Sequence, residues 1–319
     1  MISNQKEQKQ KTGIERKKGV EMQVFHFENL VLISAEEVMA LLDKIEDIPS
    51  LPVVATKILK IVNSPDFTVK ALSDLIKMDS ALTAKVFKIS NSAFYRGNSE
   101  IKNIDDAIMR LGVSQIKSIV IGISVIKSFK KFDQFGLDVV EFWKHSLAVA
   151  LLNKTIGEYY GFKNADDMWI SGILHDIGKL IYCLYMPTLM QRVLSEANEK
   201  KITFYQAENN LLKFNHCNVG RWLCEKWGIP KRVAKCVEHH HTPPVNKFIL
   251  GDVTNDIGVC HISDSIVKKA KIGNSGDYIP IIDNNIWEYI PQEKMRAPEF
   301  LEKIKDFKKE MTDIFNLFN

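Results

Sequence analysis

Three features of the sequence predict an all-α protein. Apolar residues recur at three- and four-residue spacing in nearly every segment, which is the pattern of amphipathic helices. Capping residues and prolines stand where these segments begin, as they do in first turns of helices. We find no stretch that sustains the two-residue alternation of a strand, so we expect no sheet.

The N-terminal half is expected to begin with a helix over residues 35–46. Ser34 can cap it, and Glu37 completes a capping box three residues later. Ser50-Leu51-Pro52 opens the next helix, because proline is tolerated in a first turn. Further helices are expected over residues 69–78, 80–90, 103–111 and 114–129.

The second half reads as a longer series of amphipathic helices. They are expected over residues 139–160, 165–185, 187–200, 203–214, 218–227, 231–240 and 256–271, with a last one over residues 298–318. Residues 246–255 are expected to form a loop. Residues 272–292, rich in Gly, Asn and Pro, are expected to form another loop.

The 319 residues, of which 45% are hydrophobic, are enough for two packed helical units. We expect a disordered basic tail over residues 1–21, because they hold little to bury. An N-terminal helical subdomain is expected over 22–132, packed on a metal-binding helical bundle over 133–271. A loop and a C-terminal helix over 272–319 complete the chain. The boundary between the subdomains is placed near residues 130–136.

Composition excludes several classes of protein. A net charge of +4 spread over the chain gives no basic stripe, so we expect no nucleic-acid partner. Five cysteines without CxxC spacing argue against a disulfide framework and against a cysteine-rich zinc site. The N-terminus has no apolar signal core, and no apolar run is long enough to span a bilayer. We therefore expect a soluble, cytoplasmic protein with no membrane contact.

The main functional signal is the clustering of histidines, seven of which lie between positions 145 and 261. The sharpest motif is His175-Asp176, placed in an otherwise apolar helix. A buried, ionised Asp176 is costly unless a positive partner such as a divalent cation compensates it. Lys179 lies three residues later on the same face, where it can pair with the carboxylate or with an anionic substrate. The plain alternative is a local pair on a helix surface.

Other residues extend this motif, although each also has a plain structural reading. Glu141 and His145 are four residues apart and share a helix face. His216 stands at a helix entrance, where it can also be a cap or a surface residue. Of three consecutive histidines, His239 is expected to be a polar loop residue, and His261 is expected to be packed or hydrogen-bonded. The set that can supply nitrogen and oxygen donors to a one- or two-metal site is Glu141, His145, His175, Asp176, His216, His240, His241 and Asp264.

These motifs resemble a known family. The segment from His175 to Lys179 is similar to the HDxGK signature of the HD superfamily of metal-dependent phosphohydrolases. The first half resembles HDOD domains, which are HD-related output domains of bacterial signalling proteins. The segments that carry this likeness are Ile48-Pro49-Ser50-Leu51-Pro52, Asp79-Ser80-Ala81-Leu82, Asn91-Ser92-Ala93-Phe94-Tyr95 and Ala107-Ile108-Met109-Arg110-Leu111-Gly112. The resemblance covers residues 35–270 and implies a helical HDOD subdomain on an HD-type bundle.

The related HD-GYP phosphodiesterases have metal ligands at positions similar to all eight residues of this donor set. The chain departs from them after His241, where it reads Thr242-Pro243-Pro244-Val245-Asn246 and lacks Gly-Tyr-Pro. This departure argues against hydrolysis of cyclic di-GMP, but it does not remove the metal ligands. The implied cofactor is one or two divalent ions. Iron or manganese is favoured, and zinc is the alternative.

Two functions follow as hypotheses. The first is a bacterial regulatory protein that responds to a signalling protein or a nucleotide, with the metal structural, sensory or vestigial. The second is a metal-dependent phosphohydrolase or phosphodiesterase, in which Asp176 and Lys179 take part in catalysis. The sequence leaves open whether the protein forms a homodimer.

Overall fold

The computed structural model confirms a helical fold. It describes residues 10–17, 20–27, 34–45, 48–62, 64–95, 99–129, 137–243, 252–277, 292–305 and 307–318. The predicted subdomain boundary at 130–136 lies outside these residues, as do most of the predicted loops at 246–255 and 272–292.

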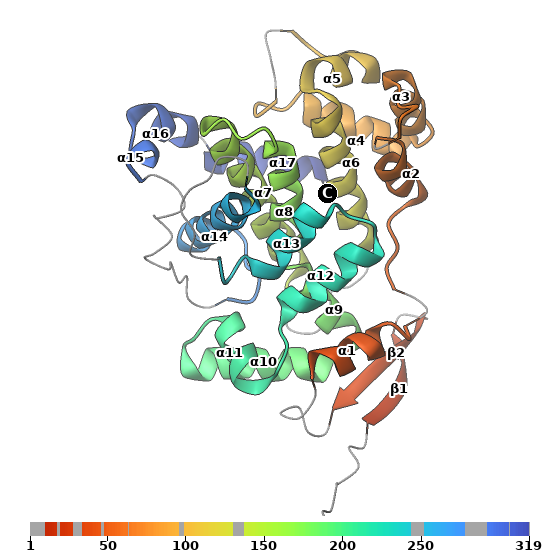
Figure 1. Ribbon diagram of the computed structural model, residues 1–319, viewed down its shortest axis with the longest axis vertical. Coiled ribbons are helices and arrows are strands. Elements are labelled where there is room, and N and C mark those ends of the chain that lie inside the picture. Colours follow the sequence, from red (N-terminus) through yellow and green to blue (C-terminus); the bar gives the residue numbers. More distant parts are fainter. Residues whose placement is uncertain are drawn as a thin grey trace, which may run out of the picture.

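Six helices form the N-terminal part of the helical fold, at the right of Figure 1. Ser34 and Glu37 make the expected capping box at the first of them. The side chain of Asn91 closes the connection before the fifth helix, because it bonds both to the N–H and to the carbonyl of Ile101. The helices are α1 (Ala35–Leu42), α2 (Val53–Ile61), α3 (Val69–Lys77), α4 (Ser80–Ser90), α5 (Ile104–Leu111) and α6 (Val113–Phe129).

The second part is a bundle around a helix that is buried along almost its whole length. This central helix, α7 (Val139–Tyr159), is apolar on most faces, as a helix surrounded by others must be. Around and beyond it lie α8 (Ala165–Leu174), α9 (Ile177–Tyr185), α10 (Pro187–Lys200), α11 (Phe204–Leu211), α12 (His216–Lys226), α13 (Lys231–His239) and α14 (Val253–Lys269). The C-terminal helices are α15 (Gln292–Met295), α16 (Pro298–Lys305) and α17 (Phe307–Phe318), so two helices cover the span predicted as one.

Polar bonds fasten the N-terminal segment to α12. The indole N–H of Trp222 donates to Asp43, just after α1, over 2.9 Å. Lys226 pairs with the same carboxylate at 2.8 Å. The indole N–H of Trp227 donates to the carbonyl of Pro49 over 2.9 Å. Helix α12, which carries His216, is thus tied to both parts of the fold.

The expectation of no sheet is wrong for residues 10–17 and 20–27, which include part of the tail that was expected to be disordered over 1–21. Strands β1 (Gln10–Lys17) and β2 (Val20–Phe27) form an antiparallel hairpin, with Gln10 opposite Phe27. The backbone of β2 lies against α9 and α10. Val20, Met22 and Val24 alternate with polar residues, which is a short strand pattern that the charged surroundings hide.

The predicted helix over 165–185 is two helices, α8 and α9, which separate at His175 and Asp176. No proline marks this point and the apolar residues continue across it, so Asp176, a residue type favoured at helix N-termini, and Gly178 are the local signals of the break. Asp176 stands at the N-cap of α9, yet its carboxylate makes no capping bond. It is turned instead toward a group of imidazoles.

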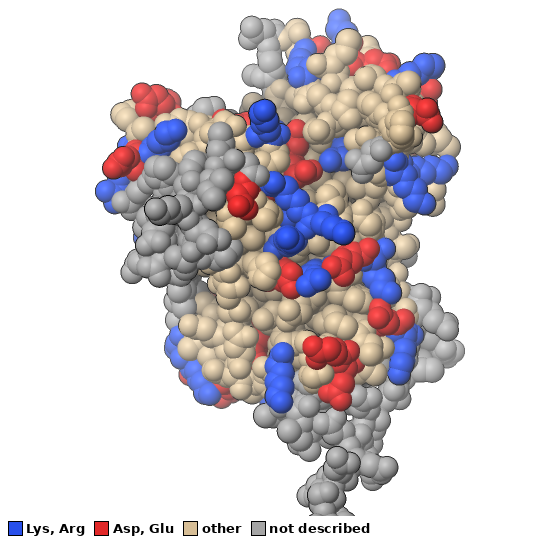
Figure 2. Space-filling model, viewed as in Figure 1, with Lys and Arg blue, Asp and Glu red and all other residues tan. Residues whose placement is uncertain are grey.

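Among the described residues, no single helix combines the length and apolarity needed to cross a membrane. Helices α5 and α6 meet that criterion only as a pair, and they join at a bend of 116°. On the described part of the face in Figure 2, Lys and Arg side chains are interspersed with Asp and Glu side chains.

Candidate metal centre

Asp176 lies at the centre of the predicted cluster and has no exposed side-chain surface. Its Oδ1 atom lies 3.1 Å from Nε2 of His216 and 3.6 Å from Nε2 of His240. Its Oδ2 atom lies 3.3 Å from Nε2 of His175 and 4.0 Å from Nε2 of His145. The two oxygens of one carboxylate therefore face two different pairs of imidazoles.

The first group comes from α7, the α8–α9 break and α14. Asp264 of α14 directs Oδ1 at this group, 3.0 Å from Nε2 of His145 and 3.6 Å from Nε2 of His175. The ligand atoms of His145, His175 and Asp176 lie within 4.8 Å of one another. Two imidazoles and two carboxylates thus meet at one buried point, a donor set suited to a divalent cation.

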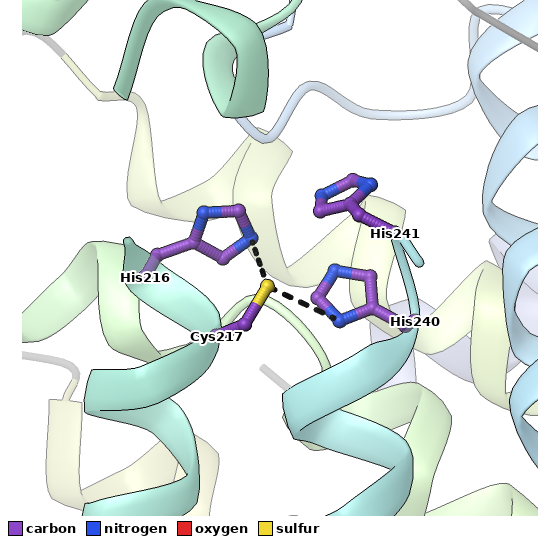
Figure 3. A group of neighbouring side chains, drawn as sticks. All are labelled: His216, Cys217, His240 and His241. Atoms are coloured by element: carbon purple, nitrogen blue, oxygen red, sulfur yellow. Dashed lines mark hydrogen bonds between the residues drawn. The ribbon is translucent and has the colours of Figure 1, made fainter. Parts of the chain in front are cut away.

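The second group comes from the start of α12 and the end of α13, and it contains a cysteine. Figure 3 shows Cys217 between His216 and His240, with His241 beside them. The thiol Sγ lies 3.6 Å from Nε2 of His216 and 3.8 Å from Nδ1 of His240. Burial opposes the thiolate, but the two neighbouring imidazoles outweigh burial and lower the pKa of Cys217 to about 7. Cys217 was not among the predicted site residues, because no second cysteine stands at CxxC spacing from it.

Hydrogen bonds at Nδ1 orient three of the rings. His175 Nδ1 bonds to the carbonyl of Gly172 and His240 Nδ1 to that of Val237, each over 2.8 Å, while His216 Nδ1 lies 2.6 Å from Glu208 Oε2. A carbonyl or carboxylate partner requires the proton on Nδ1, which leaves the Nε2 lone pair free to bind a metal. This is the arrangement expected of histidine ligands.

Several donor atoms of the cluster are buried and unsatisfied. Within the part of the chain that the structure describes, no well-oriented hydrogen bond is made by Nε2 of His145, His175, His240 and His241, by Oδ1 of Asp176 or by Oδ1 of Asp264, although several of these atoms lie 3.0–3.6 Å from another atom of the cluster. Buried polar atoms are rarely left without a partner, because each one costs free energy. A cation among these atoms would satisfy them together, so the residues present fit a metal.

The ionisation of the cluster points the same way. Burial opposes the charge of Asp176, but Lys179 and His175 hold its pKa well below the usual range. Burial also disfavours charged His175, yet the Asp176 carboxylate raises the pKa of that ring to about 9. Burial lowers the pKa values of His145 and His241. It also disfavours charged His216 and His240, but Cys217 and neighbouring carboxylates raise the pKa values of these two rings. A divalent cation would compete with those protons.

Two features that position His216 escaped the sequence analysis. Glu208 of α11 is fully buried and accepts from both the backbone N–H and Nδ1 of His216, each over 2.6 Å. Gly178 of the HDxGK segment lets α9 approach α12, because a Cβ atom there would lie 2.0 Å from the carbonyl oxygen of His216. The first residue was hidden because nothing in the sequence links positions 208 and 216.

A buried ion-pair network adjoins the cluster. Lys179 Nζ lies 3.0 Å from Asp176 Oδ2, as the spacing predicted. It also lies 3.1 Å from Asp277, in the segment over 272–277 to which no role was assigned. Lys268 of α14 pairs with Asp264 at 2.7 Å and with Asp277 at 2.8 Å.

The structure brings together seven of the eight predicted metal ligands, namely His145, His175, Asp176, His216, His240, His241 and Asp264. Glu141 is the exception: its side chain is about one-third exposed, pairs with Lys144 and belongs to neither group. It lies one helical turn before His145 but points elsewhere. The expectation for His261 is confirmed, since this ring bonds to the carbonyl of His240. His239 lies outside the cluster with its side chain 46% exposed beside Glu238, but it ends helix α13 and is not the loop residue that was expected.

Comparisons with known proteins agree with this fold. A crystal structure of an HDOD domain protein from Geobacter sulfurreducens superposes with a TM-score of 0.72 at 24% identity, covering 88% of this chain and 96% of that one. A candidate phosphohydrolase from Shewanella amazonensis SB2B superposes with a TM-score of 0.66 at 23% identity, covering 88% and 98%.

A sequence relative also exists among curated proteins, an uncharacterized protein of Treponema pallidum (strain Nichols). It is 22% identical over 203 residues, which are 63% of this chain and only 39% of that relative. The HDOD domain family model matches residues 48–243, well over half of the chain. The chain therefore belongs to the HDOD domain family.

Proposed function

We propose that this chain is a regulatory HDOD protein whose buried histidine and aspartate cluster binds one or two divalent cations. The observation that carries the proposal is the set of unsatisfied Nε2 and carboxylate oxygen atoms that converge on Asp176. Burying so many polar atoms without a partner would cost several kcal/mol. A bound cation removes that cost.

The two oxygens of Asp176 support two adjacent cation positions. His145, His175 and Asp264 would hold the first cation, together with Oδ2 of Asp176. The second would lie near Oδ1, held by His216, His240, His241 and the Cys217 thiolate. Nitrogen and oxygen donors favour iron or manganese, and zinc is the alternative because Cys217 adjoins the second position.

A direct test measures the metal content of protein purified without added metal. We expect near-stoichiometric metal in the wild type and a clear loss in His240→Ala. His239→Ala is the matched control, because this neighbouring histidine is exposed and outside the cluster. Equal metal content in the two variants would refute the proposal. It would also be refuted if the wild type is purified without metal and the addition of iron, manganese or zinc does not change its stability.

Burial of the cluster favours a regulatory or structural role for the cation. His175, Asp176, His216 and His240 have no exposed surface, so a large substrate has no direct access in this conformation. The fold would then change its stability with cation occupancy, and a signalling protein or a nucleotide would bind to the occupied form. Thermal unfolding with and without a chelator measures this coupling.

The second candidate is a metal-dependent phosphohydrolase, which the Shewanella relative's name also suggests. Two buried lysines beside the carboxylates favour it, since cationic groups stabilise phosphoryl oxygens. The cations, when bound, would polarise a phosphate oxygen and lower the pKa of bound water. Turnover of a panel of nucleotides and phosphodiesters, lost in Asp176→Asn, would favour this function over the first.

A further inference from the structure

Two lysines from different helices share one buried carboxylate. Lys179 of α9 is fully buried and Lys268 of α14 is 10% exposed. Their Nζ atoms lie 3.1 and 2.8 Å from the same atom, Oδ2 of Asp277. The other oxygen, Oδ1, accepts the backbone N–H of Phe204 over 2.8 Å. Asp277 thus receives one N–H donor and two ammonium groups in a buried site.

The segment that carries Asp277 is held tightly against the cluster. Gly273 has a φ of 67°, and a Cβ atom there would lie 2.3 Å from the backbone nitrogen of His145. The N–H of Asn274 donates to the carbonyl of Glu141 over 2.9 Å. Both contacts fasten residues 272–277 to α7. The HDOD family model matches residues 48–243, so Asp277 joins the site from a segment outside the matched region.

The charges of the network depend on whether cations are present. Asp176 and Asp264 pair with Lys179 and Lys268, and they are also among the ligands proposed above. Once cations engage these two carboxylates, the lysines lose part of their compensation. Asp277 then supplies one negative charge to two ammonium groups. The position that Asp277 occupies consequently favours an anion of higher charge than one carboxylate.

We propose that Lys179 and Lys268 form a binding subsite for a phosphate group and that Asp277 is its built-in occupant. The inference rests on the cation site of the proposed function. The subsite offers two ammonium groups and one backbone N–H, which match the several acceptor oxygens of phosphate. A phosphoryl group must displace Asp277 to enter, so residues 272–277 act as an internal competitor next to the cations.

Inorganic phosphate binding to the full-length, metal-loaded protein tests the proposal. Calorimetry should show affinity increased on the order of ten- to a hundredfold in Asp277→Asn, because the competing charge is removed. Asp277→Glu keeps the charge and should stay weak. Asp256→Asn is the matched control, since this buried carboxylate pairs with Arg232 away from the cluster. Unchanged affinity in folded Asp277→Asn would overturn the proposal.

A measurement on the wild type decides the matter if Asp277→Asn does not fold. High phosphate should lower the hydrogen-exchange protection of the Asn274 amide, which donates to the carbonyl of Glu141, because residues 272–277 must move when Asp277 leaves the subsite. Unchanged or increased protection would overturn the proposal. The metal content separates the two hypotheses. Absence of metal refutes the cation site. Full metal content together with a phosphate affinity that Asp277→Asn does not change refutes only the phosphate subsite.

Discussion

Replacing Glu208 by Gln tests whether the second histidine group is prepared for a metal. Glu208 is fully buried, and its carboxylate accepts two bonds from His216, each 2.6 Å long. A glutamine has one carbonyl oxygen, so only one of the two bonds survives. Because a hydrogen bond to a charged group contributes roughly 1.5–3 kcal/mol, the metal-free protein should lose about this much stability.

The same change should weaken metal binding. If the amide NH2 group of glutamine faces Nδ1, the ring proton moves to Nε2 and occupies the lone pair that a cation needs. Loss of such a supporting bond typically lowers metal affinity about 10- to 100-fold. Competition with a chelator measures the affinity, and urea unfolding of the metal-free protein measures the stability.

Glu225→Gln is the control for this experiment. Glu225 lies on the same helix as His216, but its side chain is exposed and forms an ion pair with Arg221 at 2.9 Å. We expect its removal to change metal affinity little and stability by less than about 1 kcal/mol. Metal affinity that is equal in folded Glu208→Gln and in Glu225→Gln would show that Glu208 does not prepare His216 for a cation.

Three further predictions follow from the same geometry. Gly178→Ala should destabilise the protein by about 1–3 kcal/mol, because the new Cβ atom would lie 2.0 Å from the carbonyl oxygen of His216. An unchanged midpoint of urea unfolding would contradict this contact. The Cys217 Sγ atom lies 3.6 Å from His216 Nε2, so it can bind the same cation. The cobalt-loaded protein should therefore show a thiolate-to-cobalt charge-transfer band that Cys217→Ser abolishes. A band that persists in this variant would exclude the thiol as a ligand. Burial opposes the Asp277 carboxylate, but Lys179 and Lys268 lower its pKa from 3.8 to about 2, so its stabilisation is present above pH 3.8 and is lost as pH falls toward 2. Asp277 should contribute about 2 kcal/mol to the stability that the metal-free protein loses across this range, so the loss should be smaller by about this amount in Asp277→Asn, and equal losses in the two proteins would contradict the pairing.

The sequence predicted the helical fold well because each amphipathic helix has a local signal. Helical periodicity and caps such as Ser34 with Glu37 depend on nearby residues alone. The break at Asp176 was not predicted in this way. At this break the carboxylate faces imidazoles from α7, α12 and α13, which only the folded chain brings near.

The candidate site was predictable to the extent that histidines and aspartates in apolar helices are unusual. His145, His175 and Asp264 were found because each stands out in its own segment. Glu141 was placed in the site on its four-residue spacing from His145, but the fold directs its side chain to Lys144. Glu208 and Asp277 were missed because an acidic residue in a polar segment is ordinary, and only long-range packing buries them.

The central claim is that the imidazoles and carboxylates around Asp176 hold a cation. An anomalous difference map, collected at the absorption edge of the metal found in the purified protein, tests it most directly. A cation held by this cluster should give a peak about 2.0–2.3 Å from Nε2 of His175 and from a carboxylate oxygen of Asp176. A crystal of metal-supplemented protein with these side chains ordered and no anomalous peak among them would contradict it.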